Sequence, residues 1–187
     1  MDGRWIEFAE LLRILGRGVL VAFLTPAIVN SDVRSTTQTL SASLYPLGKV
    51  TVSPALALTR SGQPFSAYSG TLPVNYVVRT TSGGGGSVTL QATSEFSPSG
   101  GPSVAAGALT YTCSGATLGT ACSGAQTVST AAQTPVLTLP AGACTGGGGY
   151  CSSADSNSVS VHFVMPNNPS WKTGTYAVSV TITISAI

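Results

Sequence analysis

Residues 176–187 read YAVSVTITISAI, and this stretch decides the fold class. Apolar side chains recur at every second position, while Ser and Thr occupy positions 179, 181, 183 and 185. Side chains of an extended strand alternate between two faces, so the apolar groups share one face and the hydroxyls share the other. The stretch therefore predicts a β-strand with one buried face and one face in water.

The same alternation recurs between residues 39 and 165. Gly, Pro, Asn and Ser clusters separate the alternating segments, and no helical pattern of useful length occurs after residue 31. We therefore predict an all-β fold, an antiparallel β-sandwich of the immunoglobulin-like or pilin-like type with about eight or nine strands. The clearest segments are 40–44, 72–78, 88–92 and 159–165, and weaker ones are 50–58, 109–113, 126–130 and 136–139.

The first 31 residues differ from the rest of the chain. Arg13 and Arg17 precede an apolar stretch at residues 18–29, which is shorter than the roughly 20 residues that cross a bilayer. That length is typical of a secretory signal peptide, with cleavage near Ser31 or at Ala27. The alternative is an amphipathic helix packed on the domain. We expect residues 1–31 to be a signal peptide or hydrophobic leader and residues 32–187 to be one β-sandwich domain.

Charge is scarce along the whole chain. Charged residues make up 7% of it and the net charge is +2, against roughly 25% charged residues in an ordinary domain. So few cations form no surface that could hold a nucleic acid by its phosphates. Contact with a membrane is expected only transiently, through the leader. Residues 32–187 contain eight charged side chains: Asp32, Arg34, Lys49, Arg60, Arg79, Glu95, Asp155 and Lys172.

All four cysteines lie after the leader: Cys113, Cys122, Cys144 and Cys151. An even number of cysteines in an exported chain favours disulfides formed in an oxidising compartment. Of the three pairings, we favour 113–122 and 144–151, because each closes a short loop that contains glycine. Neither spacing is that of a zinc site, so no metal is expected.

The sequence contains little that could perform catalysis. His162 is the single histidine, and the strand pattern directs its side chain outward. The acidic residues Asp32, Glu95 and Asp155 are widely scattered. The glycine runs at 83–86 and 146–149 lack the Lys and Ser/Thr of a phosphate-binding loop, so flexible loop tips are expected there. We predict no catalytic residues and no cofactor, and a secreted hydrolase is the least favoured hypothesis.

Aromatic side chains in or near loops are candidates for ligand binding. Exposed rings can stack on sugars, and Trp171, Tyr150 and Tyr68 are the residues of choice for such a site. The alternative role of Trp171 is to close one end of the sandwich against the core. Other aromatics in or near loops are Tyr45, Phe65 and Phe96.

A third candidate site is a strand for self-assembly. Residues 33–44 are nearly uncharged and alternate, and Leu40, Ala42 and Leu44 would share the apolar face. This segment could add as a donor strand to a neighbouring subunit. The alternative is that it pairs within its own domain.

Two terminal segments carry a family resemblance, TTQTLSASL at 36–44 and GTYAVSVTITISAI at 174–187, joined by an uncharged Ser/Thr/Gly-rich middle. Together they resemble exported bacterial pilin-like sandwiches, and the nearest family is the spore coat protein U domain, also found in pilus subunits assembled by chaperone and usher. In that family a cysteine usually lies early in the chain, whereas here all four lie between 113 and 151. The resemblance implies a surface role without catalysis, and it carries over no site residues.

These observations predict a non-catalytic protein that is secreted to the bacterial cell surface. It would be a filament, pilus or matrix subunit that contacts copies of itself or other surface proteins through β-strands. The alternative is a carbohydrate-binding or adhesin module that contacts glycans.

Overall fold

The computed structural model describes residues 38–81, 83–141 and 157–187. The chain divides into two compact units, Met1–Ser41 and Ala42–Ile187, and the fold below is that of the second unit. The leader predicted at residues 1–31 lies outside the described residues. Within the described ranges, no helix is long and apolar enough to cross a membrane.

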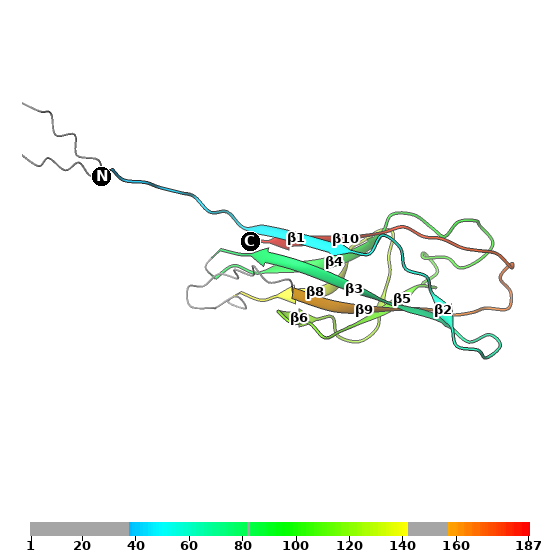
Figure 1. The fold of residues 1–187 in the computed structure, drawn as a ribbon. Coiled ribbons are helices and arrows are strands. Elements are labelled where there is room, and N and C mark those ends of the chain that lie inside the picture. The colour runs from blue at the N-terminus through cyan, green and yellow to red at the C-terminus, as the bar shows by residue number, and fades with distance from the viewer. Residues whose placement is uncertain (1–37, 82, 142–156) are drawn as a thin grey trace, which may run out of the picture. The chain divides into compact units, whose positions relative to one another are not determined.

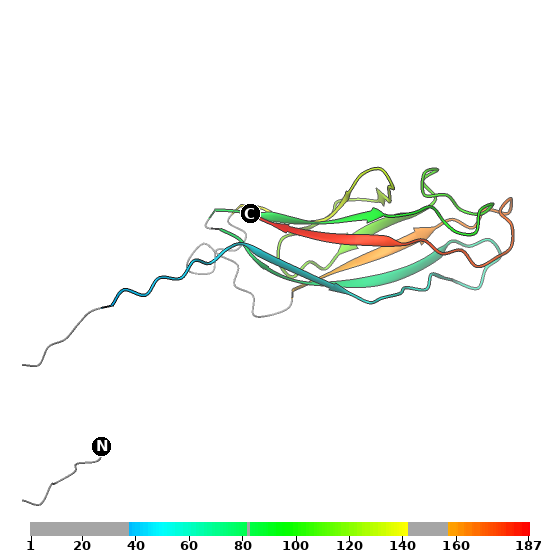
Figure 2. The same cartoon turned by 90° about the horizontal axis from the view of Figure 1, so that it is seen from above.

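The described part of the chain is all β, with two antiparallel sheets facing each other (Figures 1 and 2). The predicted all-β sandwich is therefore confirmed. Two of its ten strands, Thr59–Arg60 and Thr120–Ala121, lie outside the predicted segments, because two residues are too few to show an alternating pattern. The strands are β1 (Leu47–Val52), β2 (Thr59–Arg60), β3 (Tyr68–Arg79), β4 (Gly86–Ala92), β5 (Thr110–Ser114), β6 (Thr120–Ala121), β7 (Gln126–Thr127), β8 (Thr134–Leu139), β9 (Asn157–Met165) and β10 (Val180–Ala186).

The strand order places two strands at neighbouring edges. The first sheet has the order β1-β3-β9-β5-β7, with β2 also paired to β3, and the second has the order β10-β4-β8-β6. β1 is thus an edge strand of the first sheet, and β10 is an edge strand of the second.

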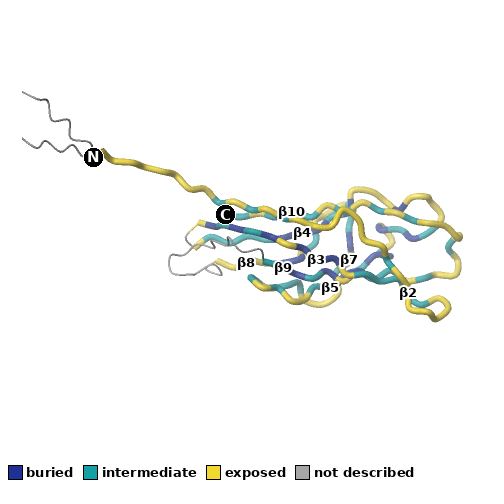
Figure 3. Tube along the Cα trace, in the orientation of Figure 1, coloured by how far each residue is buried: buried dark blue, intermediate teal, exposed yellow. Residues whose placement is uncertain are grey.

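The core lies between the two sheets. Residues at alternate positions of the central strands are buried, and Figure 3 colours the backbone at these residues dark blue. Burying these Val, Leu and aromatic groups supplies the main driving force for folding. The most deeply buried aliphatic side chains are Val74, Val88, Leu90, Val136 and Val161.

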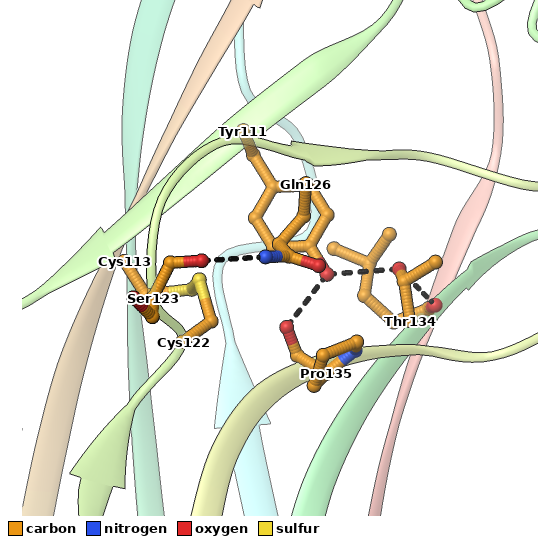
Figure 4. The surroundings of a disulfide bond; sticks show 8 residues. Tyr111, Cys113, Cys122, Ser123, Gln126, Thr134 and Pro135 are labelled. Carbon is orange, nitrogen blue, oxygen red and sulfur yellow. Dashed lines mark hydrogen bonds between the residues drawn. A yellow bond between two sulfur atoms is a disulfide. The ribbon is translucent and has the colours of Figure 1, made fainter.

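Two tyrosines lie in this core with their hydroxyls satisfied. Tyr76 donates a hydrogen bond to the carbonyl of Leu118. The Tyr111 hydroxyl bonds to Thr134 Oγ1 and lies 2.8 Å from the Pro135 carbonyl oxygen (Figure 4). Burial raises the pKa of both phenols above their ordinary range, so both stay neutral donors.

One disulfide links the two sheets. Cys113 lies in β5 of the first sheet, and Cys122 directly follows β6 of the second, with 5.2 Å between their Cα atoms (Figure 4). The predicted 113–122 pairing is confirmed. The predicted 144–151 pairing lies outside the described residues.

Of the glycine run at residues 83–86, the last three are sites of close backbone contact and not a free loop tip, whereas a Cβ added to Gly83 would meet no neighbour. A Cβ on Gly84 would overlap the carbonyl oxygen of Ile187, and one on Gly86 would overlap that of Ser185. Thr81 N–H donates to Ile187 O at 3.0 Å, and Ile187 N–H donates to Gly85 O at 2.9 Å. Glycine is therefore needed here so that the C-terminal segment can lie directly against this turn. The run at 146–149 lies outside the described residues.

Candidate functional site

The strongest candidate site is the side of the sandwich where β1 and β10 are neighbours. The two strands lie close together but belong to different sheets. At Gly48 they approach so closely that an added Cβ would lie 3.0 Å from Ile184 Cγ2. No ladder joins β1 to β10 among the strands described, so this side of the sandwich is not closed by hydrogen bonds.

Beyond Val52 the chain leaves the sheet, and an apolar groove opens between the sheets. Its volume is about 320 Å³. One wall is formed by residues 52–58 and the other by residues 178–182 of the last strand segment. Core side chains also line it, namely Leu72, Leu109 and Phe163. An occupant of the groove would therefore extend the hydrophobic core.

The apolar face of β10 is only half-buried. The sequence predicts that one face of this strand is buried, but Val180, Ile182, Ile184 and Ala186 are all intermediate in exposure. They pack against the core, yet β10 has a neighbouring strand on one side only. A further strand beside β10 would bury the exposed part of these four side chains.

Among the described residues, no strand pairs with the outer side of β10 either. Ser179 O accepts the N–H of Thr93, and Ile187 N–H donates to Gly85 O, both at 2.9 Å. Bonded and non-bonded pairs alternate along an antiparallel ladder, so the odd-numbered residues of β10 bond to β4. The N–H and C=O groups of the four even-numbered residues therefore point toward the free edge.

This free edge carries no protection against pairing. Natural proteins block exposed edges with charges, proline or bulges. No charged residue or proline occurs from Thr173 to Ile187, and β10 keeps a regular register with β4. The edge of β1, by contrast, carries Lys49.

The candidate donor residues are exposed. Leu40 is 89% and Leu44 77% exposed, and Ala42 between them is exposed as well. No strand is formed over residues 38–46, so the strand predicted at residues 40–44 is wrong: the first strand begins only at Leu47. The segment is anchored at its C-terminal end, where Arg79 Nε donates to Tyr45 O at 3.0 Å.

The aromatic candidates occupy different settings. Tyr68 begins β3 and is half-buried, and Trp171 is half-buried in the loop after β9. Within the described ranges the side chains that pack on the core from this loop include Tyr176 but not Trp171. Phe96 is buried, and Tyr150 lies outside the described residues.

Phe65, one of the aromatic residues expected in or near loops, has an unusual geometry. It is 62% exposed and has φ of 53°, a conformation that bulky residues rarely adopt. The signal in the sequence is Gln-Pro-Phe-Ser at 63–66, a turn sequence with an aromatic residue where glycine is expected.

The titratable candidates for catalysis are not brought together. His162 is exposed on the outer face, as predicted, with Nδ1 3.0 Å from Thr71 Oγ1. Glu95 accepts the N–H groups of Val104 at 2.7 Å and Ala105 at 2.8 Å, and the Ala105 bond contributes most to lowering the pKa of this carboxyl. No cluster that could hold a metal occurs among the described residues. Asp32 and Asp155 lie outside them.

Comparison with known proteins adds no family assignment. No protein-family model matches this chain, and no curated protein matches it. The fold and the site geometry alone therefore define its class, an antiparallel β-sandwich with one unprotected edge.

Proposed function

We propose that this chain is a non-catalytic, exported structural protein of the bacterial cell surface, a filament, pilus or matrix subunit that assembles through β-strand contacts. The donor strand is the segment that contains Leu40, Ala42 and Leu44. The acceptor is the free edge of β10, together with the apolar groove beside it, in a second copy.

The observation that carries this proposal is the state of β10. Its four even-numbered residues have half-buried side chains and outward-facing backbone groups. An added strand would pair those backbone groups and cover those side chains at once, as in β-augmentation.

The donor segment matches this acceptor in its alternation. Residues opposite each other in adjacent strands point to the same face of a sheet. With the Leu40, Ala42 and Leu44 side chains turned toward the groove, Thr39, Ser41 and Ser43 would continue the outer hydroxyl face formed by Thr181, Thr183 and Ser185. Added in this register, the segment continues both faces of the second sheet.

A second copy is the favoured acceptor because of where the segment is anchored. Tyr45 is held by Arg79, which pairs with Leu47 at the start of β1. The groove begins at Val52, at the other end of that strand. To reach its own groove, the segment would have to reverse direction at once and run back along β1.

Weak electrostatic repulsion also favours association. The described residues contain five charged side chains, Lys49, Arg60, Arg79, Glu95 and Lys172. A surface with so little charge keeps copies apart only weakly.

The test is electron microscopy and size-exclusion chromatography of the native chain and of a variant that lacks residues 32–45. We expect polymers from the native chain and monomers from the variant. A matched pair of substitutions separates sequence from length: Leu40→Ser with Leu44→Ser should abolish polymers, and Ser41→Ala with Ser43→Ala should preserve them. Polymers that persist in the deletion variant would exclude the donor segment.

A further inference from the structure

The hairpin between β2 and β3 holds an aromatic ring in solvent at the tip of a tight turn. Ser66 N–H donates to Gln63 O at 3.3 Å, which closes a four-residue turn over positions 63–66. Pro64 is its second residue, and Phe65, with φ of 53°, is its third. A turn with proline second and a positive φ third normally has glycine or asparagine at that third position.

Several hydrogen bonds to the carbonyl oxygen of Gln63 stabilise the turn. Gln63 O accepts a hydrogen bond from Ser66 Oγ at 3.0 Å and a long one from Arg60 Nη1 at 3.4 Å, in addition to the Ser66 N–H. Ser66 Oγ is also 3.1 Å from Ser61 O. Unfavourable backbone conformations persist only where the surrounding structure holds them. These bonds hold the backbone at Phe65 in place, so the position from which the ring projects is set before a ligand binds.

Neither hydrophobic packing nor backbone preference accounts for the phenylalanine. The ring is 62% exposed, so most of its surface gains nothing from burial. Figure 3 shows the loop after β2 as largely exposed. Glycine would satisfy the backbone better, and a polar residue would suit the solvent better. A role for the ring itself, as a contact surface, accounts for both costs.

Arg60 and Tyr68, on the two strands that lead to this turn, indicate the kind of ligand. Arg60 pairs directly with Tyr68 across the hairpin, so their side chains share one face. The Arg60 guanidinium has several N–H donors beyond the one on Gln63 O. Residues 59–69 contain no carboxylate and Arg60 as their single cation. The hairpin therefore carries an exposed apolar ring in its turn and, on the strands that lead to the turn, one neutral and one cationic hydrogen-bond donor.

We propose that the tip of the β2–β3 hairpin is a saccharide-binding site, where the Phe65 ring stacks on the C–H face of a sugar and Arg60 and Tyr68 bind its hydroxyls. A sugar ring presents both surfaces that this tip matches, one apolar and one rich in hydroxyls. Nucleic acid needs several cations to offset its phosphates. A membrane surface needs a broad apolar face with several basic residues.

The test uses the full chain, a glycan array and pull-down on insoluble cellulose and chitin. Binding to at least one of these saccharide probes is expected, and Phe65→Ala and Phe65→Gly should weaken it by about tenfold or more, as for a residue that anchors a ligand. Phe65→Trp should retain binding, and Arg60→Gln should weaken it. Tyr45→Ala, which removes another exposed ring, is the matched control and should leave binding unchanged.

Phe65→Gly separates loss of the ring from loss of the fold, since it suits the turn and its melting temperature should not fall. The variant that lacks residues 32–45 should still bind, so this site can be tested whether or not the chain polymerises. Failure of every saccharide probe to bind, or binding that survives Phe65→Gly, would overturn the proposal. So would Phe65-dependent binding to phosphatidylcholine–phosphatidylglycerol vesicles in place of saccharides.

Discussion

Replacing Phe65 with glycine should stabilise the domain, although it removes a large apolar side chain. A non-glycine residue in the left-handed region costs roughly 1–2 kcal/mol, and Phe65 occupies that region. Against this gain, the extra freedom of glycine in the unfolded chain costs roughly 0.4–1 kcal/mol. Little burial is lost, because the ring is 62% exposed. The net expectation is a stabilisation of about 0.5–1 kcal/mol.

This change is measurable by differential scanning calorimetry and by denaturant unfolding. For a domain of this size, 1 kcal/mol shifts the melting temperature by roughly 2–4 °C, so Phe65→Gly should melt about 1–4 °C higher. Phe65→Ala is the control, because it removes the ring but keeps the Cβ that opposes positive φ. It should show no such rise. A glycine variant that melts below the native protein would refute the argument that this residue is held at a backbone cost.

Three further perturbations test the stabilising features of the sandwich. Glu95→Gln should make the melting temperature fall less steeply as the pH is lowered. The pKa of Glu95 is lowered in the folded protein, so its carboxylate stabilises the fold above the unfolded-state pKa of about 4.5. This stabilisation is lost as the pH falls through the folded-state pKa. Melting scans between pH 7 and pH 2 check this, and identical acid limbs would contradict it. Replacing Cys113 and Cys122 together with serine should cost about 2–3 kcal/mol in urea unfolding, because it frees a short loop; an unchanged midpoint would show that the bond contributes nothing. Gly84→Ala should lower the melting temperature, because its Cβ would overlap the Ile187 carbonyl. Gly174→Ala should not, because its Cβ would lie 3.7 Å from the Tyr176 ring, an ordinary contact distance.

The two sheets are joined differently at the two sides of the sandwich, and this difference supports the proposed assembly. Where β5 and β6 lie, the Cys113–Cys122 disulfide ties the sheets together covalently. Where β1 and β10 lie, nothing covalent joins the described strands, and the groove opens between them. The sheets can therefore receive an added strand on one side while they stay joined on the other.

The sequence predicted much of the fold because that information is local. The alternation in residues 180–186, 72–78 and 159–165 identifies strands without any knowledge of their neighbours. The outward direction of His162 followed from the same alternation. The 113–122 pairing was predicted because this bond closes a short loop that contains glycine. Two-residue strands such as β6 were beyond reach, since they contain too few positions to show a period.

Tertiary structure decided what the alternation could not. Apolar side chains at every second position mark both β3, which has neighbours on both sides and buries Val74, and β10, which has one neighbour and leaves Ile182 half-exposed. Strand order depends on contacts between distant residues, and those contacts leave no local mark. The conformation of Phe65 is similar, because the bonds that hold the 63–66 turn are seen only in the folded hairpin.

The sequence by itself thus determined the kind of strand from which this protein is built, alternating and poor in charge, with apolar side chains at every second position. Only the tertiary structure decided which strand is left at an open edge and which aromatic ring is held in solvent. The physical reason is that a side chain's preference for water or core is a property of its own chemistry. Whether that preference is satisfied depends on which neighbours the rest of the chain supplies.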